Sequence, residues 1–250
     1  MCIVTTSWDD GDALDMRVAE MLDRFGVKGT FYIPREYGSR HISDDRLRAL
    51  AKRHEIGSHT LTHPNMTTIS REQKYAEASG SRKWLEDITG KPVEMFCYPG
   101  GQYDEETIDV VREAGYKGAR TAKSPVVSHP FDPHRLGVSL TFFPRPFTRA
   151  DYGRAAFRRL LAPMAPVLPA FVSGESWQKY SSFGQRIIDL FEKAHRENGV
   201  FHIYGHSWAN TRYGLWSLLE RVLTHIGGRE DCEYLTNGEV VERLSKQKSV

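Results

Sequence analysis

Short apolar runs alternate with amphipathic stretches along the first half of the chain. Residues 2–8 form a β-rich run, and residues 14–25 repeat apolar side chains at the spacing of one helical face. Gly26 then marks the end of this helix, because glycine readily adopts the left-handed conformation of a helix cap. The pattern therefore predicts a strand followed by a helix at the start of the chain.

The same alternation predicts most of the remaining elements. Further strands are expected at 27–33, 55–59, 93–98, 116–121, 200–204 and near 233–235, and further helices at 43–53, 70–88, 104–114, 185–197, 215–223 and from 238 onward. A chain in which strands and helices take turns forms parallel strands joined by crossover helices. We therefore expect an α/β fold, either a barrel or an open doubly wound sheet.

Between about residues 124 and 182 this alternation is lost. Prolines, arginines and aromatic residues crowd there, which predicts an irregular excursion with one short helix. A lid that grips a substrate is the alternative, because binding residues often lie on loops. With 250 residues the chain can bury a sizeable core, and we expect one domain, 1–250, that carries this insertion.

Composition narrows the class of protein. The chain is 40% hydrophobic and 26% charged with a net charge of +2, which gives no reason to expect a nucleic-acid partner. It contains no run of about 18 apolar residues, so we expect no membrane span. Residues 2–6 read as a strand rather than a signal peptide, although a chain trimmed of a leader would look the same.

Three cysteines, Cys2, Cys97 and Cys232, are spread over the whole chain. They are too few and too scattered to predict a disulfide framework or a thiolate zinc site. We therefore expect a reducing, cytoplasmic setting.

Two pairs of side chains are candidates for chemistry. His59 and His63 are four residues apart, which suits a metal-binding pair. Asp9 and Asp10 lie at the end of the first apolar run, where Gly11 supplies a turn. Because neighbouring strand residues face opposite ways, both carboxylates serve one site only where the strand has ended. Surface histidines and a helix-capping turn are the simpler interpretations of the two patterns.

In parallel β/α folds, functional side chains gather at the carboxyl ends of strands. Asp10, His59 and His63 would there form a site with two nitrogen ligands, one oxygen ligand and open positions, the pattern of hydrolytic zinc centres. Imidazole and carboxylate groups also accept Co²⁺ and Ni²⁺. We therefore expect a divalent metal, with Zn²⁺ the first choice.

Five segments together resemble the polysaccharide deacetylases, the NodB-like family. These are Ser-Trp-Asp-Asp-Gly at 7–11, the histidine motif at 58–64, Cys-Tyr-Pro-Gly-Gly at 97–101, and the segments 201–208 and 235–240. Their order and spacing make the resemblance specific, and it spans nearly the whole chain apart from the insertion. It implies a distorted (β/α) barrel with parallel strands and outer helices, serving as a single catalytic domain.

The resemblance also implies an enzyme, a metal-dependent hydrolase that removes N-acetyl groups from an amino-sugar glycan or glycoconjugate. By position, Asp10 and the two histidines bind the metal. Asp9 is the general base that takes a proton as metal-bound water attacks the amide carbonyl. The backbone N–H of Gly100 helps to hold the oxyanion, and His206 protonates the departing amine as an imidazolium.

This chain departs from the family pattern at three places. The third motif usually starts with an arginine that orients the catalytic aspartate, and here Cys97 stands in its place. We expect Arg120, at the end of a predicted strand, to replace that arginine. The family's fourth motif, an acidic pair ending in tryptophan, is not visible after Arg120. Tyr204 stands where an apolar residue often lines the acetyl pocket.

Four residues are expected to line the substrate site: Tyr98, Pro99, Tyr204 and Trp208. The pattern leaves open whether Trp208 stacks on a sugar or packs inside the protein. His202 is expected in the barrel wall. Five other histidines are expected at the surface or in loops: His54, His129, His134, His195 and His225.

Two other functions stay open. One is the hydrolysis of a C–N bond in a non-carbohydrate amide, such as a cyclic amide or a formamide. The other is carbohydrate binding on a catalytically inactive scaffold, against which the retained carboxylates and histidines weigh. The length of the substrate and the oligomeric state are not predicted.

Overall fold

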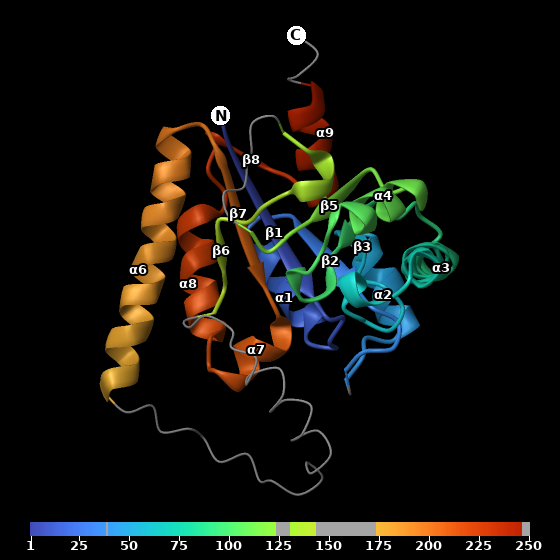
Figure 1. The fold of residues 1–250 in the computed structure, drawn as a ribbon. Coiled ribbons are helices and arrows are strands. Elements are labelled where there is room, and N and C mark those ends of the chain that lie inside the picture. Colours follow the sequence, from blue (N-terminus) through green and yellow to red (C-terminus); the bar gives the residue numbers. More distant parts are fainter. Residues whose placement is uncertain (39, 124–130, 144–173, 247–250) are drawn as a thin grey trace, which may run out of the picture.

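The computed structural model describes residues 1–38, 40–123, 131–143 and 174–246 (Figure 1). Its strands are β1 (Cys2–Asp9), β2 (Gly29–Ile33), β3 (Glu55–Ser58), β4 (Met95–Cys97), β5 (Gly118–Arg120), β6 (Leu140–Thr141), β7 (Val200–Gly205) and β8 (Cys232–Tyr234). Its α-helices are α1 (Asp15–Arg24), α2 (Asp44–Ala51), α3 (Arg71–Thr89), α4 (Glu105–Glu113), α6 (Gly174–Arg196), α7 (Ser207–Arg212), α8 (Trp216–Ile226) and α9 (Asn237–Lys246). Short 3-10 turns are η1 (Met66–Thr68), η2 (Pro99–Gly101) and η3 (Pro133–Arg135).

The described strands form one parallel sheet in the order β5-β4-β3-β2-β1-β7-β6, and β8 also pairs with β1. The segment 136–142 joins the two ends of this sheet. The amide of Leu136 donates to Ala119 O at 2.9 Å, and that of Ser139 donates to His202 O at 2.9 Å. Successive helical crossovers return each strand in the same direction, which makes the sheet parallel. The parallel sheet, together with the segment that joins its two ends, confirms the expected distorted (β/α) barrel.

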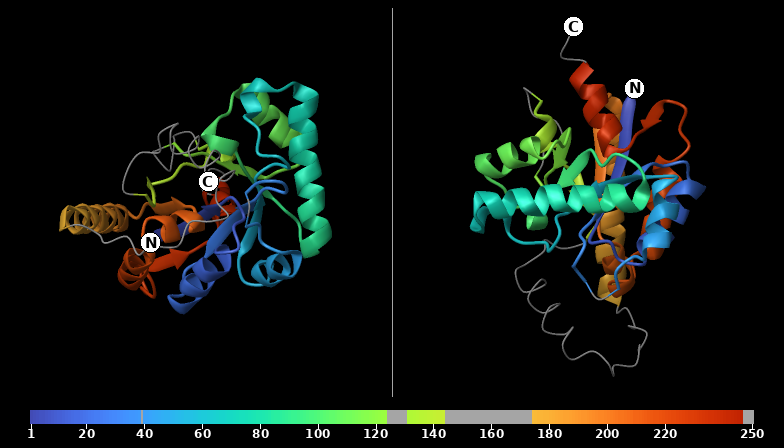
Figure 2. Two further views of the ribbon diagram at one scale, coloured as in Figure 1. Left: turned by 90° about the horizontal axis from the view of Figure 1, so that it is seen from below. Right: turned by 90° about the vertical axis from the view of Figure 1, so that its right-hand side faces the viewer.

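Helices cover the outer face of the barrel. In Figure 1, α6 and α8 lie to the left of the strands and α2, α3 and α4 to the right, around the outside of the curled sheet, and Figure 2 shows the length of α3. The capping box of Ser70 and Gln73 starts α3, and Gly90 ends it with φ 67°. Within the described ranges, no helix combines the length and the apolar character needed to cross a membrane.

Side chains alternate along β1 between an apolar outer face and a polar interior. Val4 and Trp8 belong to the apolar cluster that packs under the helices, whereas Ser7 contacts His202 of β7. Nδ1 of His202 donates to Gly137 O at 2.8 Å, so its Nε2 accepts from the Ser7 hydroxyl at 2.9 Å. The interior of this barrel is therefore held by satisfied polar contacts.

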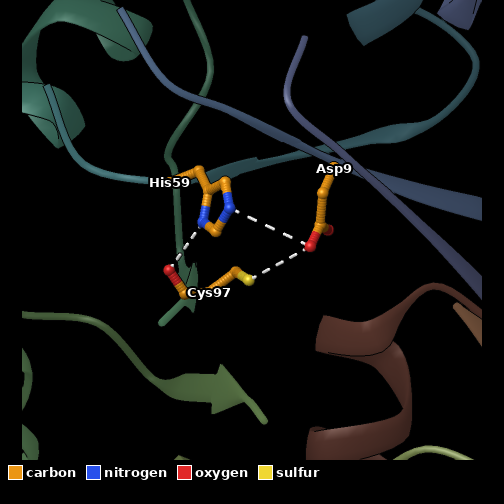
Figure 3. Close-up of side chains that lie close together, drawn as sticks. All are labelled: Asp9, His59 and Cys97. Carbon is orange, nitrogen blue, oxygen red and sulfur yellow. Dashed lines mark hydrogen bonds and ion pairs between the residues drawn. The ribbon is translucent and has the colours of Figure 1, made fainter. Parts of the chain in front are cut away.

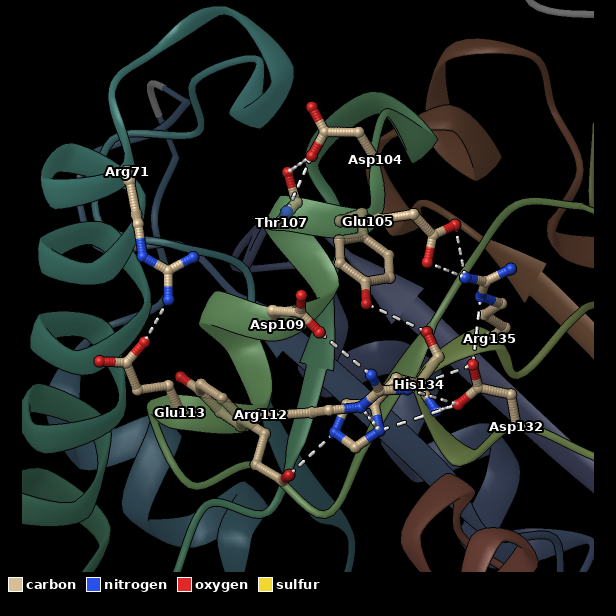
Figure 4. A network of polar contacts seen from close by, with 12 residues as sticks. Arg71, Asp104, Glu105, Thr107, Asp109, Arg112, Glu113, Asp132, His134 and Arg135 are labelled. Atoms are coloured by element: carbon tan, nitrogen blue, oxygen red, sulfur yellow. Dashed lines mark hydrogen bonds and ion pairs between the residues drawn. The ribbon is translucent and has the colours of Figure 1, made fainter.

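A polar network joins α4 to the turn η3 on the outer side of β5 (Figure 4). Within it, His134 is buried, and its Nε2 donates to Tyr116 O at 3.0 Å while its Nδ1 accepts from Arg112 Nε at 3.4 Å. His54 is also buried, with its ring 5.4 Å from that of Phe31. Of the two settings expected for these histidines, surface or loop, both residues take the second, because each lies in a connecting segment and is buried beside the sheet.

Three elements differ from the predicted ones. The strand β6 and the helix α7 were not predicted, because two and six residues are too short to show a periodicity. The helix α6 begins at Gly174, well before the predicted start at 185. Within the expected irregular insertion, the structure describes residues 131–143, which include η3 and β6, and the residues from 174 onward, which form the start of α6. The lid alternative and His129 lie outside the described residues.

Candidate active site

The Asp9–Asp10 pair lies where β1 ends in a turn. Asp9 is the last residue of the strand, and the next two residues have left-handed backbones, with φ 79° at Asp10 and φ 60° at Gly11. A Cβ atom added at Gly11 would lie 2.9 Å from Cγ2 of Ile33, so this turn requires glycine. The turn brings both carboxylates to the same rim of the barrel.

The loop with the two candidate histidines follows β3. Two of its residues have left-handed backbones, Thr60 with φ 70° and His63 with φ 57°. One carboxylate oxygen of Glu77, in α3, accepts from the amides of Leu61 at 2.7 Å and Thr62 at 2.9 Å. Its other oxygen accepts from the Thr62 hydroxyl at 2.6 Å. Glu77 therefore clamps this loop onto the helix that follows it.

The predicted metal ligands converge at this rim. Ligand atoms of Asp10, His59 and His63 all lie within 4.8 Å of one another. The Nε2 atoms of the two histidines are 3.1 Å apart, and His63 Nε2 is 3.9 Å from Asp10 Oδ1. Two nitrogens bound to one tetrahedral zinc ion lie about 3.3 Å apart, so this spacing fits a divalent cation.

The protonation of the two rings also fits a cation. Nδ1 of His59 donates to Cys97 O at 2.9 Å, which leaves the lone pair of Nε2 directed at the other ligands. Burial, reinforced by neighbouring His63, lowers the pKa of His59 to about 4. Burial lowers the pKa of His63 as well. Both imidazoles are neutral near pH 7, which is the form that binds a metal.

Asp9 stands beside these ligands without belonging to them. Its Oδ2 lies 3.9 Å from His59 Nε2 and accepts from the Cys97 thiol at 3.7 Å (Figure 3). Burial raises the pKa of Cys97 well above its usual value, so the thiol keeps its proton and donates it to this contact. Cys97 thus acts as a hydrogen-bond donor to Asp9.

Arg120 reaches Asp9 from the end of β5. Its Nη2 donates to both oxygens of Asp9, and its guanidinium lies 4.2 Å from the ring centre of Tyr204 and 5.3 Å from that of Tyr32. Strand register pairs Arg120 with Cys97 of β4. The arginine therefore sits one strand away from the family's usual position but at the same height in the barrel.

The charge of Asp9 follows from these neighbours. Burial alone would raise the pKa of this carboxyl, but the Arg120 guanidinium, with His59 and His206 nearby, holds it below its ordinary value. Asp9 is therefore ionised at neutral pH while remaining almost fully enclosed.

His206 and Trp208 enter the site from the other side of β1. His206 directly follows β7, and its Nε2 lies 3.8 Å from Asp10 Oδ2. Trp208 is half-buried and its Nε1 donates to Asp10 Oδ2 at 2.8 Å. The tryptophan expected to stack on a sugar or to pack inside the protein thus also holds a predicted metal ligand in place.

In the segment after β4, some residues are buried in the core and others lie at the rim of the barrel. Cys97 faces Asp9, so Tyr98 faces outward, where it is buried and its hydroxyl donates to His134 O at 3.0 Å. In this structure Tyr98 therefore lies away from the rim, contrary to its expected place at the substrate. Pro99 is buried, and Gly100 is exposed in the turn η2 with φ 59°. Tyr204 is buried against Arg120 and His206, with its ring 5.3 Å from the imidazole.

Sequence reasoning missed two residues of this site. Tyr37 stacks on His63 with ring centres 4.1 Å apart and the planes at 20°. Glu77 holds the histidine loop from within a helix. Neither has a sequence signal, because an aromatic residue in a loop and a glutamate in a helix are both ordinary at a protein surface.

Comparisons with known proteins show which family the chain resembles. Residues 2–119 match the family model described as polysaccharide deacetylase. The peptidoglycan deacetylase of Helicobacter pylori is 20% identical in an alignment 249 residues long, which covers 92% of this chain and 83% of that protein. YxkH of Bacillus subtilis is 27% identical over 145 residues, so the match spans 55% of this chain and only about half, 52%, of that relative.

Solved structures show a similar fold. A protein from Mycobacterium smegmatis has a TM-score of 0.69 at 14% identity, over 99% of this chain and 91% of that one. The chitin deacetylase of the fungus Colletotrichum lindemuthianum has a TM-score of 0.59 at 18% identity, over 95% of this chain and 86% of that one. At these identities the likeness concerns the barrel alone.

Proposed function

Because this chain is a NodB-like relative of the polysaccharide deacetylases, we propose that it is a metal-dependent hydrolase that removes N-acetyl groups from an amino-sugar glycan or glycoconjugate. One observation carries the proposal. Asp10, His59 and His63 converge at one rim, and an ionised carboxylate, that of Asp9, lies beside them with its Oδ2 3.9 Å from His59 Nε2. The Helicobacter relative, a peptidoglycan deacetylase, matches along most of its length and supports this class of substrate.

The three converging side chains would hold the cation. When bound there, a divalent ion such as Zn²⁺ supplies Lewis-acid polarisation of the acyl carbonyl and activation of water. Trp208 fixes one oxygen of Asp10, and the Cys97 carbonyl fixes the ring of His59. These contacts leave the ligands little freedom, so the site is preorganised.

Asp9 would accept the proton of the attacking water. Arg120 binds both of its oxygens, which orients the carboxylate and keeps it charged. A proton acceptor must be in its basic form before the reaction, and the low pKa of Asp9 ensures this at neutral pH. The Cys97 thiol gives the carboxylate a further fixed contact.

Gly100 would stabilise the oxyanion and His206 would protonate the departing amine. Gly100 is exposed at the rim end of β4, where its amide would donate to the oxygen that gains negative charge. His206, 3.8 Å from Asp10 Oδ2, would give a proton to the departing amine. The product amine and acetate then leave the site.

Acetate release from N-acetylated amino-sugar oligomers tests this proposal. We expect release to stop when a chelator removes the metal and to return when Zn²⁺ or Co²⁺ is added. His63→Ala should lower kcat/KM by at least about a hundredfold, since it removes a metal ligand. The matched control is His225→Ala, at an exposed position on α8. Release that survives chelation, or a His63→Ala variant within a few-fold of wild type, would refute the proposal.

A further inference from the structure

Two cysteines that are distant in sequence meet at the amino end of the barrel. Cys2 begins β1 and Cys232 begins β8, and the parallel register pairs these two residues directly. Both are free thiols and both are buried. Because the register aligns the two residues on neighbouring parallel strands, their side chains lie on the same face of the sheet at this end.

A histidine and an aspartate complete the cluster. His195, in the last turn of α6, has its Nε2 2.7 Å from Asp231 Oδ2. The Cys232 thiol lies 3.8 Å from Asp231 Oδ1. One ligand atom each from His195, Asp231 and Cys232 lie within 4.8 Å of one another. Cys2 is not one of these three residues, but it pairs with Cys232 on the neighbouring strand and adds a second sulfur atom on the same face of the sheet.

Other charged groups surround the cluster. Arg229 Nε lies 3.4 Å from Asp231 Oδ1, and its Nη1 lies 3.3 Å from Glu192 Oε1. His225 Nε2 pairs with the same Glu192 oxygen at 2.8 Å. The positive charge of the N-terminal amino group also acts on Cys2. These cations offset part of the negative charge that two thiolates and a carboxylate would carry.

We propose that Cys2, His195, Asp231 and Cys232 form a second, structural site for a thiophilic divalent cation of the Zn²⁺ class. Structural zinc sites have four protein ligands and usually include sulfur, and this set supplies four. Asp231 and His195 are partly exposed, so an ion reaches the site from solvent. The cation would replace the protons of the Cys2 and Cys232 thiols, which are released to water.

This second site is separate from the proposed active site. Cys2 starts the strand that Asp9 ends, and seven residues of extended chain span about 23 Å. The bound cation would tie β1 and β8 to the end of α6. Its expected role is therefore to stabilise the closure of the barrel, with no part in hydrolysis.

Cobalt titration of the full chain tests the inference. Protein freed of metal by a chelator, and kept reduced with a phosphine, is titrated with Co²⁺ and separately with Zn²⁺. We expect two equivalents of Co²⁺ per chain and a near-ultraviolet absorption from thiolate-to-cobalt charge transfer. Cys232→Ser should lose this absorption and one equivalent while keeping acetate release, because it lies far from Asp9.

Two matched variants separate the two sites. Cys97→Ser removes the thiol next to Asp9 and should keep the absorption, whereas His63→Ala should lose one equivalent and keep it too. Asp231→Asn, at an exposed position, should weaken Co²⁺ binding if Cys232→Ser does not fold. Wild-type protein without the absorption, or absorption that persists in Cys232→Ser, would overturn the second site. Neither result would bear on acetate release, which tests the proposed function.

Discussion

Asp9 owes its ionised state at the rim of the barrel chiefly to Arg120. Replacing Arg120 by Met would leave a buried carboxylate without its cation, which costs about 3–5 kcal/mol of stability in comparable sites. Asp9 would then take up a proton at a higher pH. We expect kcat/KM to fall by at least about a hundredfold at neutral pH, since the general base is lost.

The pH profile of kcat/KM distinguishes this role from a purely structural one. Asp9 has a lowered pKa, so its basic form is present at neutral pH and is lost only as the pH falls through that low value. In Arg120→Met the acid limb of the profile should move to higher pH. Arg120→Lys keeps the charge without the fork of donors and should shift the limb less. An acid limb that stays in place in Arg120→Met would contradict this role.

At the scale of single residues, the sequence predicts which side chains take part in the site better than it predicts which atoms they contact. The motifs of the resemblance contain Asp9, Asp10, His59 and His63, and the place of Arg120 at the end of a predicted strand suggested it as the replacement for the missing arginine. It could not show that Trp208 donates to Asp10 or that Cys97 donates to Asp9. Those contacts depend on distances between strands, which sequence spacing does not contain.

The helix α3 controls the histidine loop through one carboxylate, that of Glu77. Glu77→Ala would leave the amides of Leu61 and Thr62 without their acceptor, so the loop would lose its defined position. We expect Zn²⁺ affinity, measured by calorimetry, to fall about tenfold or more, as for other groups that position metal ligands.

The control for this change is Glu72→Ala, an exposed glutamate on the same helix. It should leave the Zn²⁺ affinity unchanged, and Glu77→Gln, which keeps one acceptor oxygen, should give an intermediate value. An affinity in Glu77→Ala equal to that in Glu72→Ala would show that the clamp does not position the ligands.

Elements with a clear periodicity could be predicted, and elements defined by tertiary pairing could not. The long helix α3 was predicted within one residue at its carboxyl end, because its capping box and Gly90 mark its limits. The two-residue strand β6 exists only because β7 lies beside it. The first turns of α6 lie inside the segment that was interpreted as an irregular insertion, so they were not predicted as helix.

The stability of the barrel depends on buried imidazoles that stay neutral, and His202 is fully buried. Burial lowers its pKa to about 3, with the Arg120 charge adding to the effect. In the unfolded chain His202 has a pKa of about 6.5. Between that pH and about 3, the unfolded chain binds a proton at His202 and the folded chain does not, so the free energy of unfolding decreases as the pH falls. The loss is about 1.4 kcal/mol per pH unit.

Denaturant unfolding between pH 7 and pH 4.5 measures this dependence. His202→Gln offers one donor and one acceptor in place of the two ring nitrogens, and its free energy of unfolding should fall less steeply with acid. Equal slopes in wild type and His202→Gln would disprove the assignment.

The barrel as a whole brings together residues that are far apart in the sequence. Cys2 and Cys232 appear unrelated in the sequence, and the three cysteines predicted no thiolate site. The strand register makes these two cysteines neighbours. In the same way, the residues 131–143 looked irregular, yet part of this segment closes the wall between β5 and β7.

The left-handed backbones at Asp10 and His63 have an evolutionary consequence. Non-glycine residues held in that conformation cost roughly 1–3 kcal/mol each, which the folded chain must offset elsewhere. Selection for heat resistance alone would favour glycine or asparagine at these two positions and would discard the cation. Screens for improved variants must therefore select for turnover together with melting temperature, because the residues that favour catalysis at these two positions differ from those that favour stability.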